Sequence, residues 1–282
     1  MTPQLRAAAI HDISCMGRCS LTAALPILSA VGIETPVIPT AVLSTHTGGF
    51  SGYTYRDLTE DIMPIVDHWT TLNRPLNAIY TGFLGSVEQI EIVSRVFDKL
   101  KTKDTLIFVD PVMADFGKLY SVYKEDFPKE MKKLCRKADM IIPNITEACF
   151  LLDIPYQEGP YAQEFIILLM KKLHDEFSNA TVILTGVYFN EDELGCACML
   201  KDEEEISYIM GEKISGFYHG TGDVFASTLL AAMLKTNDLP KACRIAVDFT
   251  VEALSRTHNE RADVRFGVDF ERGLLHLAQL LS

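Results

Sequence analysis

Residues 219–226 read His-Gly-Thr-Gly-Asp-Val-Phe-Ala (HGTGDVFA) and lead directly into an apolar segment that predicts a helix. Gly220 and Gly222 allow the backbone to approach a ligand closely, and their amides can point at one anion. The positive end of the helix dipole favours the same anion. Asp223 stands where a carboxylate can accept a proton from a hydroxyl group beside that anion. The spacing predicts phosphoryl transfer, with Gly220, Thr221 and Gly222 holding phosphate charge and Asp223 acting as base.

A purely structural interpretation fits the same residues equally well on spacing alone. In it, the glycines form a turn and Asp223 only stabilises the first turn of the helix. Two other phosphate-binding motifs are excluded. The Walker pattern GxxxxGK[ST] is absent here, and Phe225 occupies the position of the third glycine of GxGxxG.

Outward from this motif, short apolar segments alternate with helical patterns. Strands are expected at residues 6–13, 35–43, 77–82, 105–110, 138–144, 181–186, 194–200 and 205–210. Helices are expected at residues 20–32, 57–69, 86–100, 224–235, 239–257 and 270–281. This alternation predicts an α/β fold with a mainly parallel sheet covered on both faces, and the last two strands look like a meander. In the helix of residues 86–100, Ser86 and Gln89 fit a capping box.

Polar residues follow four of the expected strands: Asp12, Asp110, Asn144 and Thr185. Ligands of open α/β sheets bind at the carboxyl ends of the strands, so four polar residues on one edge predict a site there. Asp110 begins the segment DPVMAD, whose two carboxylates suit magnesium–nucleotide chemistry. An Asp-Pro turn with a solvated Asp115 is the alternative.

The segment Asn144-Ile145-Thr146-Glu147 also has two interpretations. Glu147 can hold Mg²⁺ through water, because Mg²⁺ keeps much of its hydration and uses few carboxylates. Asn144 as N-cap with Glu147 three residues later also resembles a capping box. Taken alone, the segment favours capping.

Composition narrows the class of protein. The 282 residues are 48% hydrophobic and carry a formal net charge of −12, which argues against non-specific binding to nucleic acid or anionic membrane. No repeat or linker interrupts the chain, so one domain of residues 1–282 is expected. The seven cysteines contain no CxxC pair, which favours free thiols in a reducing cytoplasm. The Gly- and Thr-rich residues 44–55 predict a functional loop.

Together, HGTGDVF, NITE and DPVMAD resemble motifs of the ribokinase superfamily. YTGFLGSVEQIEIV and LSTHTGGFSG are similar to the strand-to-helix segment and the flap of its pyridoxal kinase branch, and the resemblance covers residues from about 6 to 257. It implies a three-layer α-β-α sandwich, usually a homodimer. It also implies ATP-dependent phosphorylation of the 5′-hydroxymethyl group of a vitamin B6 compound, with Mg²⁺ and often K⁺ assisting.

The resemblance also implies roles for single residues. Asp223 would activate the substrate hydroxyl, and the Gly220-Thr221-Gly222 amides would form the anion hole. The ATP and magnesium site would be lined by Asp110, Asn144, Glu147 and Thr185, with Asp110 and Glu147 near the metal through water. The pyridine ring would be surrounded by Asp12, Thr47 and Tyr80.

The chain departs from this pattern at Asp12, where many pyridoxal kinases carry a small hydroxyl residue. A carboxylate there favours pyridoxamine, whose protonated amine can pair with it. The His11-Asp12 pair can also mark a different ring substrate. Two alternatives stay open: a hydroxymethylpyrimidine kinase of thiamin synthesis, and a ligand-binding homologue that has lost turnover.

Overall fold

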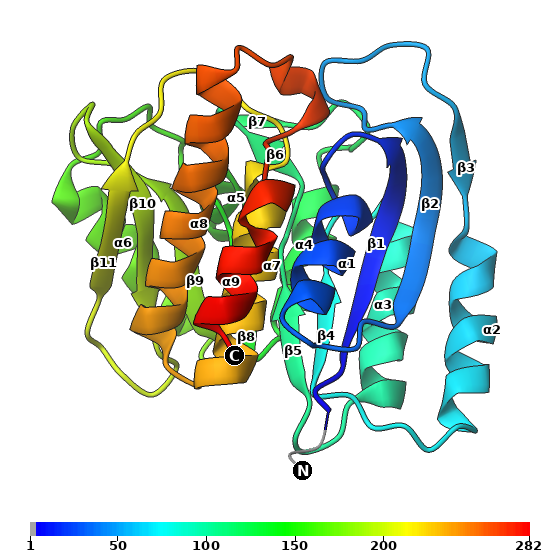
Figure 1. Ribbon diagram of the computed structural model, residues 1–282. Helices are drawn as coiled ribbons and strands as arrows, with labels where there is room; N and C mark the ends of the chain where they lie inside the picture. Colours follow the sequence, from blue (N-terminus) through cyan, green and yellow to red (C-terminus); the bar gives the residue numbers. More distant parts are fainter. Residues whose placement is uncertain (1–3) are drawn as a thin grey trace.

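A nine-stranded sheet and a separate two-stranded hairpin form the β-structure of residues 4–282, which the computed structural model describes (Figure 1). The strands are β1 (Ala7–Met16), β2 (Val37–Thr45), β3 (Tyr55–Asp57), β4 (Ala78–Thr81), β5 (Leu106–Val109), β6 (Ala114–Asp115), β7 (Lys118–Leu119), β8 (Met140–Ile141), β9 (Thr181–Val187), β10 (Glu193–Met199) and β11 (Ser207–Glu212). The helices are α1 (Leu21–Ala30), α2 (Thr59–Thr70), α3 (Val87–Leu100), α4 (Phe127–Cys135), α5 (Ile145–Leu152), α6 (Gln163–Glu176), α7 (Thr221–Thr236), α8 (Leu239–Asn259) and α9 (Leu274–Leu280), with 3₁₀ turns at η1 (Val264–Phe266) and η2 (Glu271–Gly273).

The strand order of the sheet is β11-β10-β9-β8-β5-β4-β1-β2-β3. The neighbours from β2 through β1, β4, β5 and β8 to β9 all pair in parallel. The meander expected from the sequence is confirmed, because β9, β10 and β11 pair antiparallel. At the other edge, β3 adds a short antiparallel strand to β2. All carboxyl ends of the parallel strands therefore meet at one edge, where ligands of such sheets bind.

Two hydrophobic cores lie on opposite faces of the sheet, which makes the three layers visible in Figure 1. Side chains of α2 to α6 fill one core, and side chains of α1, α7, α8 and α9 fill the other. The mainly parallel α/β sandwich expected from the sequence is confirmed. Its apolar helix α7 has no polar stripe because it packs on the sheet with α1 and α8 on either side of it, so most of its sides are buried.

The cap of α3 differs in part from expectation. Ser86 is the N-cap, and its hydroxyl oxygen accepts a hydrogen bond from the backbone N–H of Gln89 (3.1 Å). The reciprocal bond of a capping box is missing, because the side-chain oxygen of Gln89 accepts from the N–H of Gly85 instead (2.7 Å). The buried amide of Gln89 also donates to the carbonyl of Thr40 (3.0 Å). This side chain thus ties α3 to β2.

Several elements lie where none is expected from the sequence, namely β3, α4, α6 and the β6–β7 hairpin, whereas the start of α5 is where the capping interpretation of Asn144 and Glu147 expects a helix. The expected loop of residues 44–55 is shorter at both ends, because β2 extends to Thr45 and β3 begins at Tyr55. Within residues 4–282, no helix combines the length and the apolar character needed to cross a bilayer.

Candidate active site

Asp12 lies inside a strand, and the expectation that it ends the first strand is wrong. β1 continues to Met16, and its pairing with β2 shifts between His11 and Ile13, which places Asp12 opposite a bulge of β2. The carboxylate is 3% exposed and accepts a hydrogen bond from the hydroxyl of Ser14 (3.0 Å). Burial raises its pKa, and the side-chain hydroxyls of Ser14 and Ser20 partly oppose that rise.

The other three polar residues are found at the expected edge of the sheet. Asp110 directly follows β5 and is buried. Asn144 follows β8 and forms a parallel bridge with Thr185 of β9, so the two residues lie side by side. Burial raises the pKa of Asp110 well above its usual range, and the charges of Glu147 and Asp223 raise it further. The edge therefore gathers acidic residues from separate parts of the chain.

Glu147 is a capping residue, as the structural interpretation of its segment expects. Asn144 accepts from the N–H of Glu147 (2.9 Å), and one oxygen of Glu147 accepts from the N–H of Asn144 (2.9 Å). The other oxygen accepts from the N–H of Met113 (3.0 Å), which ties α5 to the DPVMAD segment. Burial raises the pKa of Glu147 to about 8, although these backbone N–H groups favour its ionised form.

The GTGD motif forms the N-terminus of α7. Gly220 is the N-cap in a left-handed conformation (φ 75°), and the helix begins at Thr221. The N–H of Val224 donates to the carbonyl of Gly220 (3.1 Å). The N–H groups of Thr221, Gly222 and Asp223 have no partner inside the helix and are available to an anion.

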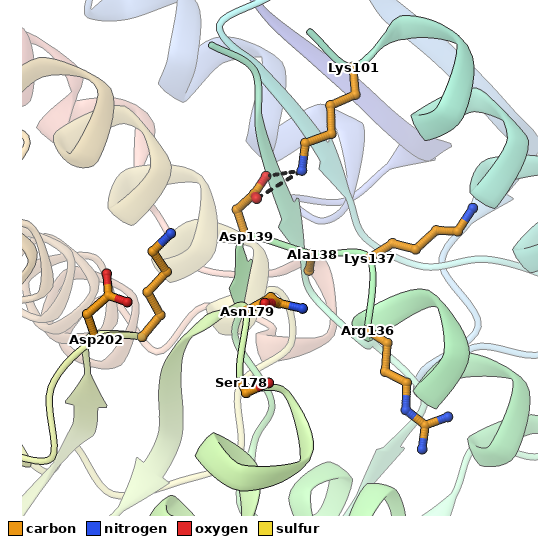
Figure 2. A pocket seen from close by; sticks show the side chains of 9 residues that line it. Lys101, Arg136, Lys137, Ala138, Asp139, Ser178, Asn179 and Asp202 are labelled. Carbon is orange, nitrogen blue, oxygen red and sulfur yellow. Dashed lines mark hydrogen bonds and ion pairs between the residues drawn. The ribbon is translucent and has the colours of Figure 1, made fainter. Parts of the chain in front are cut away.

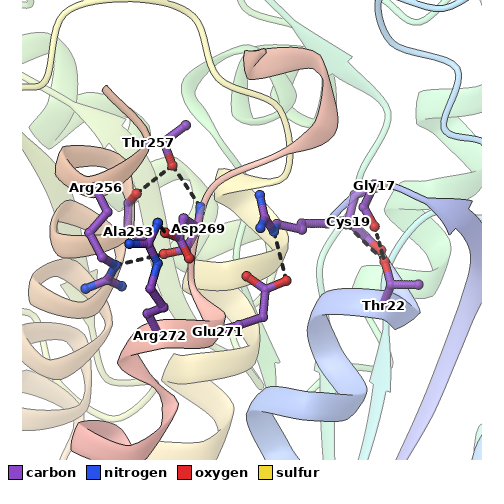
Figure 3. Close-up of polar contacts among 10 residues, drawn as sticks. Gly17, Cys19, Thr22, Ala253, Arg256, Thr257, Asp269, Glu271 and Arg272 are labelled. Atoms are coloured by element: carbon purple, nitrogen blue, oxygen red, sulfur yellow. Dashed lines mark hydrogen bonds and ion pairs between the residues drawn. The ribbon is translucent and has the colours of Figure 1, made fainter. Parts of the chain in front are cut away.

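The turn that follows β1 packs against this motif. The chain leaves β1 through residues 17–20, and the carbonyl of Arg18 in this turn lies against Gly220. The N–H of Arg18 donates to the carbonyl of Phe266 (3.0 Å), and its guanidinium donates to Glu271 (2.8 Å). Figure 3 shows this contact to Glu271 beside the bonds that Thr22 makes with the carbonyls of Gly17 and Cys19. The turn is therefore held both by the hydrogen bonds of Arg18 to Phe266 and Glu271 and by those of Thr22 to Gly17 and Cys19.

The four acidic residues Asp12, Asp110, Glu147 and Asp223 interact through their charges. Burial raises the pKa of Asp223 to about 7, and the negative charge of Asp12 raises it further, while the backbone N–H of Ser20 opposes the rise. No ion pair in residues 4–282 involves any of the four. Unpaired buried carboxylates are costly, so the cluster suits a ligand that brings positive charge.

Direct metal coordination by several side chains is not preformed. Across residues 4–282, no three His, Cys, Asp or Glu side chains converge in a way that holds a metal ion. Asp223 instead lies in the first turn of α7 beside its free amides, and its charge interacts with those of Asp12 and Asp110. Such an arrangement suits a phosphate group with a hydrated cation between phosphate and carboxylates.

Tyr80 is placed differently from the other expected site residues. Its side chain is fully buried, and its ring packs edge-on against His11 (4.4 Å between ring centroids) and Phe108 (5.1 Å). The hydroxyl lies 3.5 Å from the hydroxyl of Ser227, one turn after Asp223 in α7. Contact between Tyr80 and a substrate ring stays a prediction, since it needs the overlying side chains to move.

The flap of residues 46–54 lies on the segment that leads into Gly220. Within it, half-buried Thr47 stands between His46 and Gly48. His46 contacts His219 (4.9 Å between ring centroids), and its Nε2 donates to the carbonyl of Arg265 (2.5 Å), because its Nδ1 accepts from the N–H of Gly48 (3.1 Å). The sequence predicts no role for either histidine, although His219 begins the HGTGDVFA motif and His46 lies in the LSTHTGGFSG segment.

A hollow of about 380 Å³ lies away from these residues, at the opposite edge of the sheet (Figure 2). Its basic side chains are mostly paired: Lys101 with Asp139, Lys137 with Asp98, and Arg136 with Glu176. The candidate active site is therefore placed on the acidic cluster and the amides of α7.

Known proteins resemble this chain over almost its whole length. The sequence profile of the family described as Phosphomethylpyrimidine kinase matches residues 22–265. The pyridoxal kinase of Dictyostelium discoideum is 26% identical over 275 residues, which cover 90% of this chain and 87% of that protein.

Two crystal structures superpose closely. One is a Bacteroides thetaiotaomicron protein described as a phosphomethylpyrimidine kinase and crystallised with pyridoxal, with 34% identity, a TM-score of 0.91 and coverage of 99% of this chain and 96% of that one. The other is pyridoxal kinase from Lactobacillus plantarum, with 28% identity, a TM-score of 0.89 and coverage of 99% and 98%. These similarities confirm the ribokinase-like fold expected from the sequence.

Proposed function

The chain belongs to the phosphomethylpyrimidine kinase family, and on that premise we propose that it is an ATP-dependent kinase of a vitamin B6 vitamer. It transfers the γ-phosphoryl group of ATP to the 5′-hydroxymethyl oxygen of pyridoxal, pyridoxine or pyridoxamine. One observation carries the proposal: Asp223, with a pKa raised to about 7, stands in the first turn of a helix whose N-terminal amides are free. A base and an anion site are thus joined in one turn.

In the reaction, the hydroxyl oxygen of the vitamer attacks the γ-phosphorus while its proton passes to Asp223. The new oxygen–phosphorus bond forms as the bond between the γ-phosphorus and the bridging oxygen of ADP breaks. The amides of Thr221 and Gly222 stabilise the charge on the transferring group. A carboxylate whose pKa is near 7 is well matched to this proton transfer at neutral pH.

Asp110 and Glu147 are the residues that would hold Mg²⁺, through water, at the nucleotide side of the site. Their burial without a cationic partner among residues 4–282 fits this assignment. Neutralisation of phosphate charge is the chemistry that Mg²⁺ supplies in such sites. Asn144 and Thr185 would contact ATP beside them. Assistance by K⁺, a homodimer and a cytoplasmic location stay predictions that follow from the family resemblance and the free cysteines.

Thr47 and Asp12 are proposed to contact the vitamer. The flap that carries Thr47 is similar in sequence to the flap of the pyridoxal kinase branch, and it packs beside the segment before Gly220. Asp12 raises the pKa of Asp223, so its carboxylate lies within electrostatic reach of the reacting hydroxyl.

The main rival is a hydroxymethylpyrimidine kinase, whose aromatic hydroxymethyl substrate needs the same base and anion hole. The identity of 34% to a structure crystallised with pyridoxal favours a B6 vitamer. A non-catalytic homologue is disfavoured because Asp223 and the glycines of its motif are intact.

A substrate panel tests the proposal. Purified protein is incubated with ATP, Mg²⁺ and either pyridoxal, pyridoxine, pyridoxamine or hydroxymethylpyrimidine, and the phosphorylated product is quantified by mass spectrometry. We expect the acceptor with the highest kcat/KM to be one of the three B6 vitamers. A higher kcat/KM for hydroxymethylpyrimidine would favour the rival, and no product from any acceptor would favour the non-catalytic homologue.

A further inference from the structure

The backbone of Arg18 is in close contact with two glycines from distant parts of the chain. Its carbonyl lies against Gly220, the N-cap of α7, and also against Gly267. A Cβ atom added to Gly267 would stand only 2.7 Å from both the carbonyl oxygen and the Cβ atom of Arg18. Gly267 also has a φ of 85°, a conformation that residues with a side chain rarely adopt. The turn of residues 17–20 is therefore packed so closely that neither glycine has room for a side chain.

Residues 264–271, which we call the C-terminal segment, contact both this turn and the motif that begins at His219. The carbonyl of Phe266 accepts a hydrogen bond from the N–H of Arg18 (3.0 Å). The carbonyl of Val264 accepts one from the N–H of His219 (3.4 Å). The C-terminal segment therefore links the turn after β1 to the start of the anion site.

Helix α8 fixes the C-terminal segment through Asp269, which is buried. The N–H of Asp269 donates to the hydroxyl of Thr257 (2.8 Å), and its carbonyl accepts from the guanidinium of Arg256 (2.9 Å). Figure 3 shows these bonds, with Glu271 beside them. Because α8 packs along α7, the C-terminal segment is anchored to the same pair of helices that carries the anion site.

Ser20, the last residue of the turn, reaches the proposed base. It is buried and combines a φ of 48° with a ψ of −128°, and such strained conformations persist only where the surroundings hold them. Its backbone N–H interacts with the carboxylate of Asp223 and opposes the rise of that pKa on burial. The position of the turn therefore decides how well the ionised form of the base is stabilised.

We propose that Gly267 is a positioning residue for the base Asp223 and acts through the turn of residues 17–20. Because it has no side chain, Gly267 leaves Arg18 in place against the N-cap of α7, and the N–H of Ser20 then stays at the carboxylate. The inference rests on the proposed kinase function, in which Asp223 accepts the proton of the vitamer. A displacement of about 1 Å can lower the rate of an enzyme by about 10²-fold, so this backbone contact is expected to affect kcat.

The groups around Asp223 make the direction of a pH shift informative. The titratable groups that interact with it are Asp12, Cys19, Tyr80, Asp110 and Tyr120. Burial raises the pKa values of the thiol and of both tyrosines, so these three groups stay neutral near pH 7. The negative charge of Asp12 raises the pKa of Asp223, whereas the N–H of Ser20 lowers it. Loss of the N–H therefore raises the pKa of the base, and loss of the carboxylate contact would lower it.

Gly267→Ala and Gly32→Ala form a matched pair that tests the inference. Gly32, which follows α1, has a similar φ of 79°, but among residues 4–282 no atom lies within 4 Å of a Cβ atom added to it. Both variants carry the same kind of backbone strain, and only Gly267→Ala displaces Arg18. The rate of phosphorylation of each B6 vitamer by ATP is measured as a function of pH, and the melting temperature of each variant is recorded.

We expect Gly267→Ala to lower kcat by ~10-fold or more, because the base is displaced. The acidic limb of its kcat/KM profile should move to higher pH, because Asp223 loses the N–H that favours its ionised form. Gly32→Ala should leave kcat and the acidic limb nearly unchanged, although it carries the same kind of strain.

Thr257→Val is the second variant, and it decides the question if Gly267→Ala does not fold. It removes the hydroxyl that accepts the N–H of Asp269 and so loosens the C-terminal segment without a clash, and its acidic limb should also move to higher pH. A limb that stays in place in the folded variants overturns the inference even if kcat or the melting temperature falls, because a merely structural role has that effect. Lack of product from the unmodified protein overturns the kinase function, whereas an active enzyme with an unmoved limb overturns only the role of Gly267.

Discussion

The carbonyl oxygen of Arg18 lies so close to Gly220 that a Cβ atom added to this glycine would be only 2.1 Å from it. Gly220 also has a φ of 75°, which strains any residue with a Cβ atom. The turn after β1 is therefore built directly against the N-cap of α7, and the anion site depends on a contact between segments about 200 residues apart.

This contact predicts opposite results for two similar substitutions. Gly220→Ala should destabilise the protein by at least ~2 kcal/mol, since it combines a backbone clash with a left-handed conformation. Gly222→Ala should leave the melting temperature nearly unchanged, because no atom lies within 4 Å of its added Cβ. Thermal denaturation compares the two variants. Equal losses of stability would contradict the role assigned to the Arg18 contact.

Asp223 predicts both a loss of rate and a pH dependence. Asp223→Asn should lower kcat by at least ~10²-fold with little change in ATP affinity, because the variant cannot accept the proton. In the unmodified enzyme the base works only when ionised, so kcat/KM for the vitamer should fall as the pH drops below about 7. Near-normal kcat in the Asn variant would exclude Asp223 as the base.

The same pH profile tests the interaction between Asp12 and Asp223. Asp12 contributes to the raised pKa of Asp223 through its negative charge. Asp12→Asn removes that charge, so the acidic limb of the profile should move to lower pH. A profile that moves to higher pH, or does not move, would show that the two carboxylates do not interact in the working enzyme.

Substitution of Glu147 distinguishes a role in magnesium binding from a role in helix capping. Both of its oxygens accept hydrogen bonds from backbone N–H groups. A Gln at this position therefore places its side-chain NH₂ group against one of those backbone N–H groups. Glu147→Gln should therefore lower stability by ~1–3 kcal/mol whether or not Mg²⁺ is bound nearby. The distinguishing measurement is the Mg²⁺ concentration that gives half-maximal rate. It should rise if Glu147 helps to hold the ion and stay the same if Glu147 only caps α5.

The flap should become less accessible when both substrates are bound. We expect proteolysis within residues 44–55 to slow in the presence of a vitamer and a non-hydrolysable ATP analogue. His46→Ala should speed the cleavage of the free protein, because it removes the bond to the carbonyl of Arg265 and the contact with His219. Identical cleavage with and without ligands would argue against a mobile lid.

The sequence predicts the elements that have a local signal. Apolar strands and the stripe of α3 follow their periods, and the GTGD motif combines glycines with an apolar helix. Helix α6 also carries a helical pattern, with Phe165, Leu169 and Leu173 buried at intervals of four, so it was predictable from the sequence. The hairpin β6–β7 was not, because strands of two residues have no period to detect.

The candidate site shows the same division between local and long-range information. The capping box of Asn144 and Glu147 can be predicted from the sequence, because the two residues are only three positions apart. The bond from Met113 to Glu147 spans 34 residues, and it depends on how β5 and β8 pair. The bulge of β2 opposite Asp12 likewise depends on the pairing of β1 with β2, and no local signal in the sequence shows that the strand continues past this polar residue to Met16.

Asp12 carries the prediction of substrate preference. Its carboxylate is buried, and burial disfavours its ionised form. A bound cation offsets that cost, whereas a neutral group leaves it in place. Pyridoxamine offers a protonated amine where pyridoxal has an aldehyde. A charge-assisted hydrogen bond of ~1.5–3 kcal/mol would give pyridoxamine a kcat/KM roughly ten- to a hundred-fold higher.

Asp12→Ser is the variant that tests this preference, since it keeps a small polar group at this position of β1 and removes the charge. The ratio of kcat/KM between pyridoxamine and pyridoxal should fall toward one, while the KM for ATP stays the same. If Asp12 serves only its hydrogen bond with Ser14, a serine in its place should leave the ranking of the vitamers unchanged. Equal kcat/KM for both vitamers in the unmodified enzyme would show that no charge pairing with Asp12 guides the choice, because the amine is the group that separates the two substrates at that position.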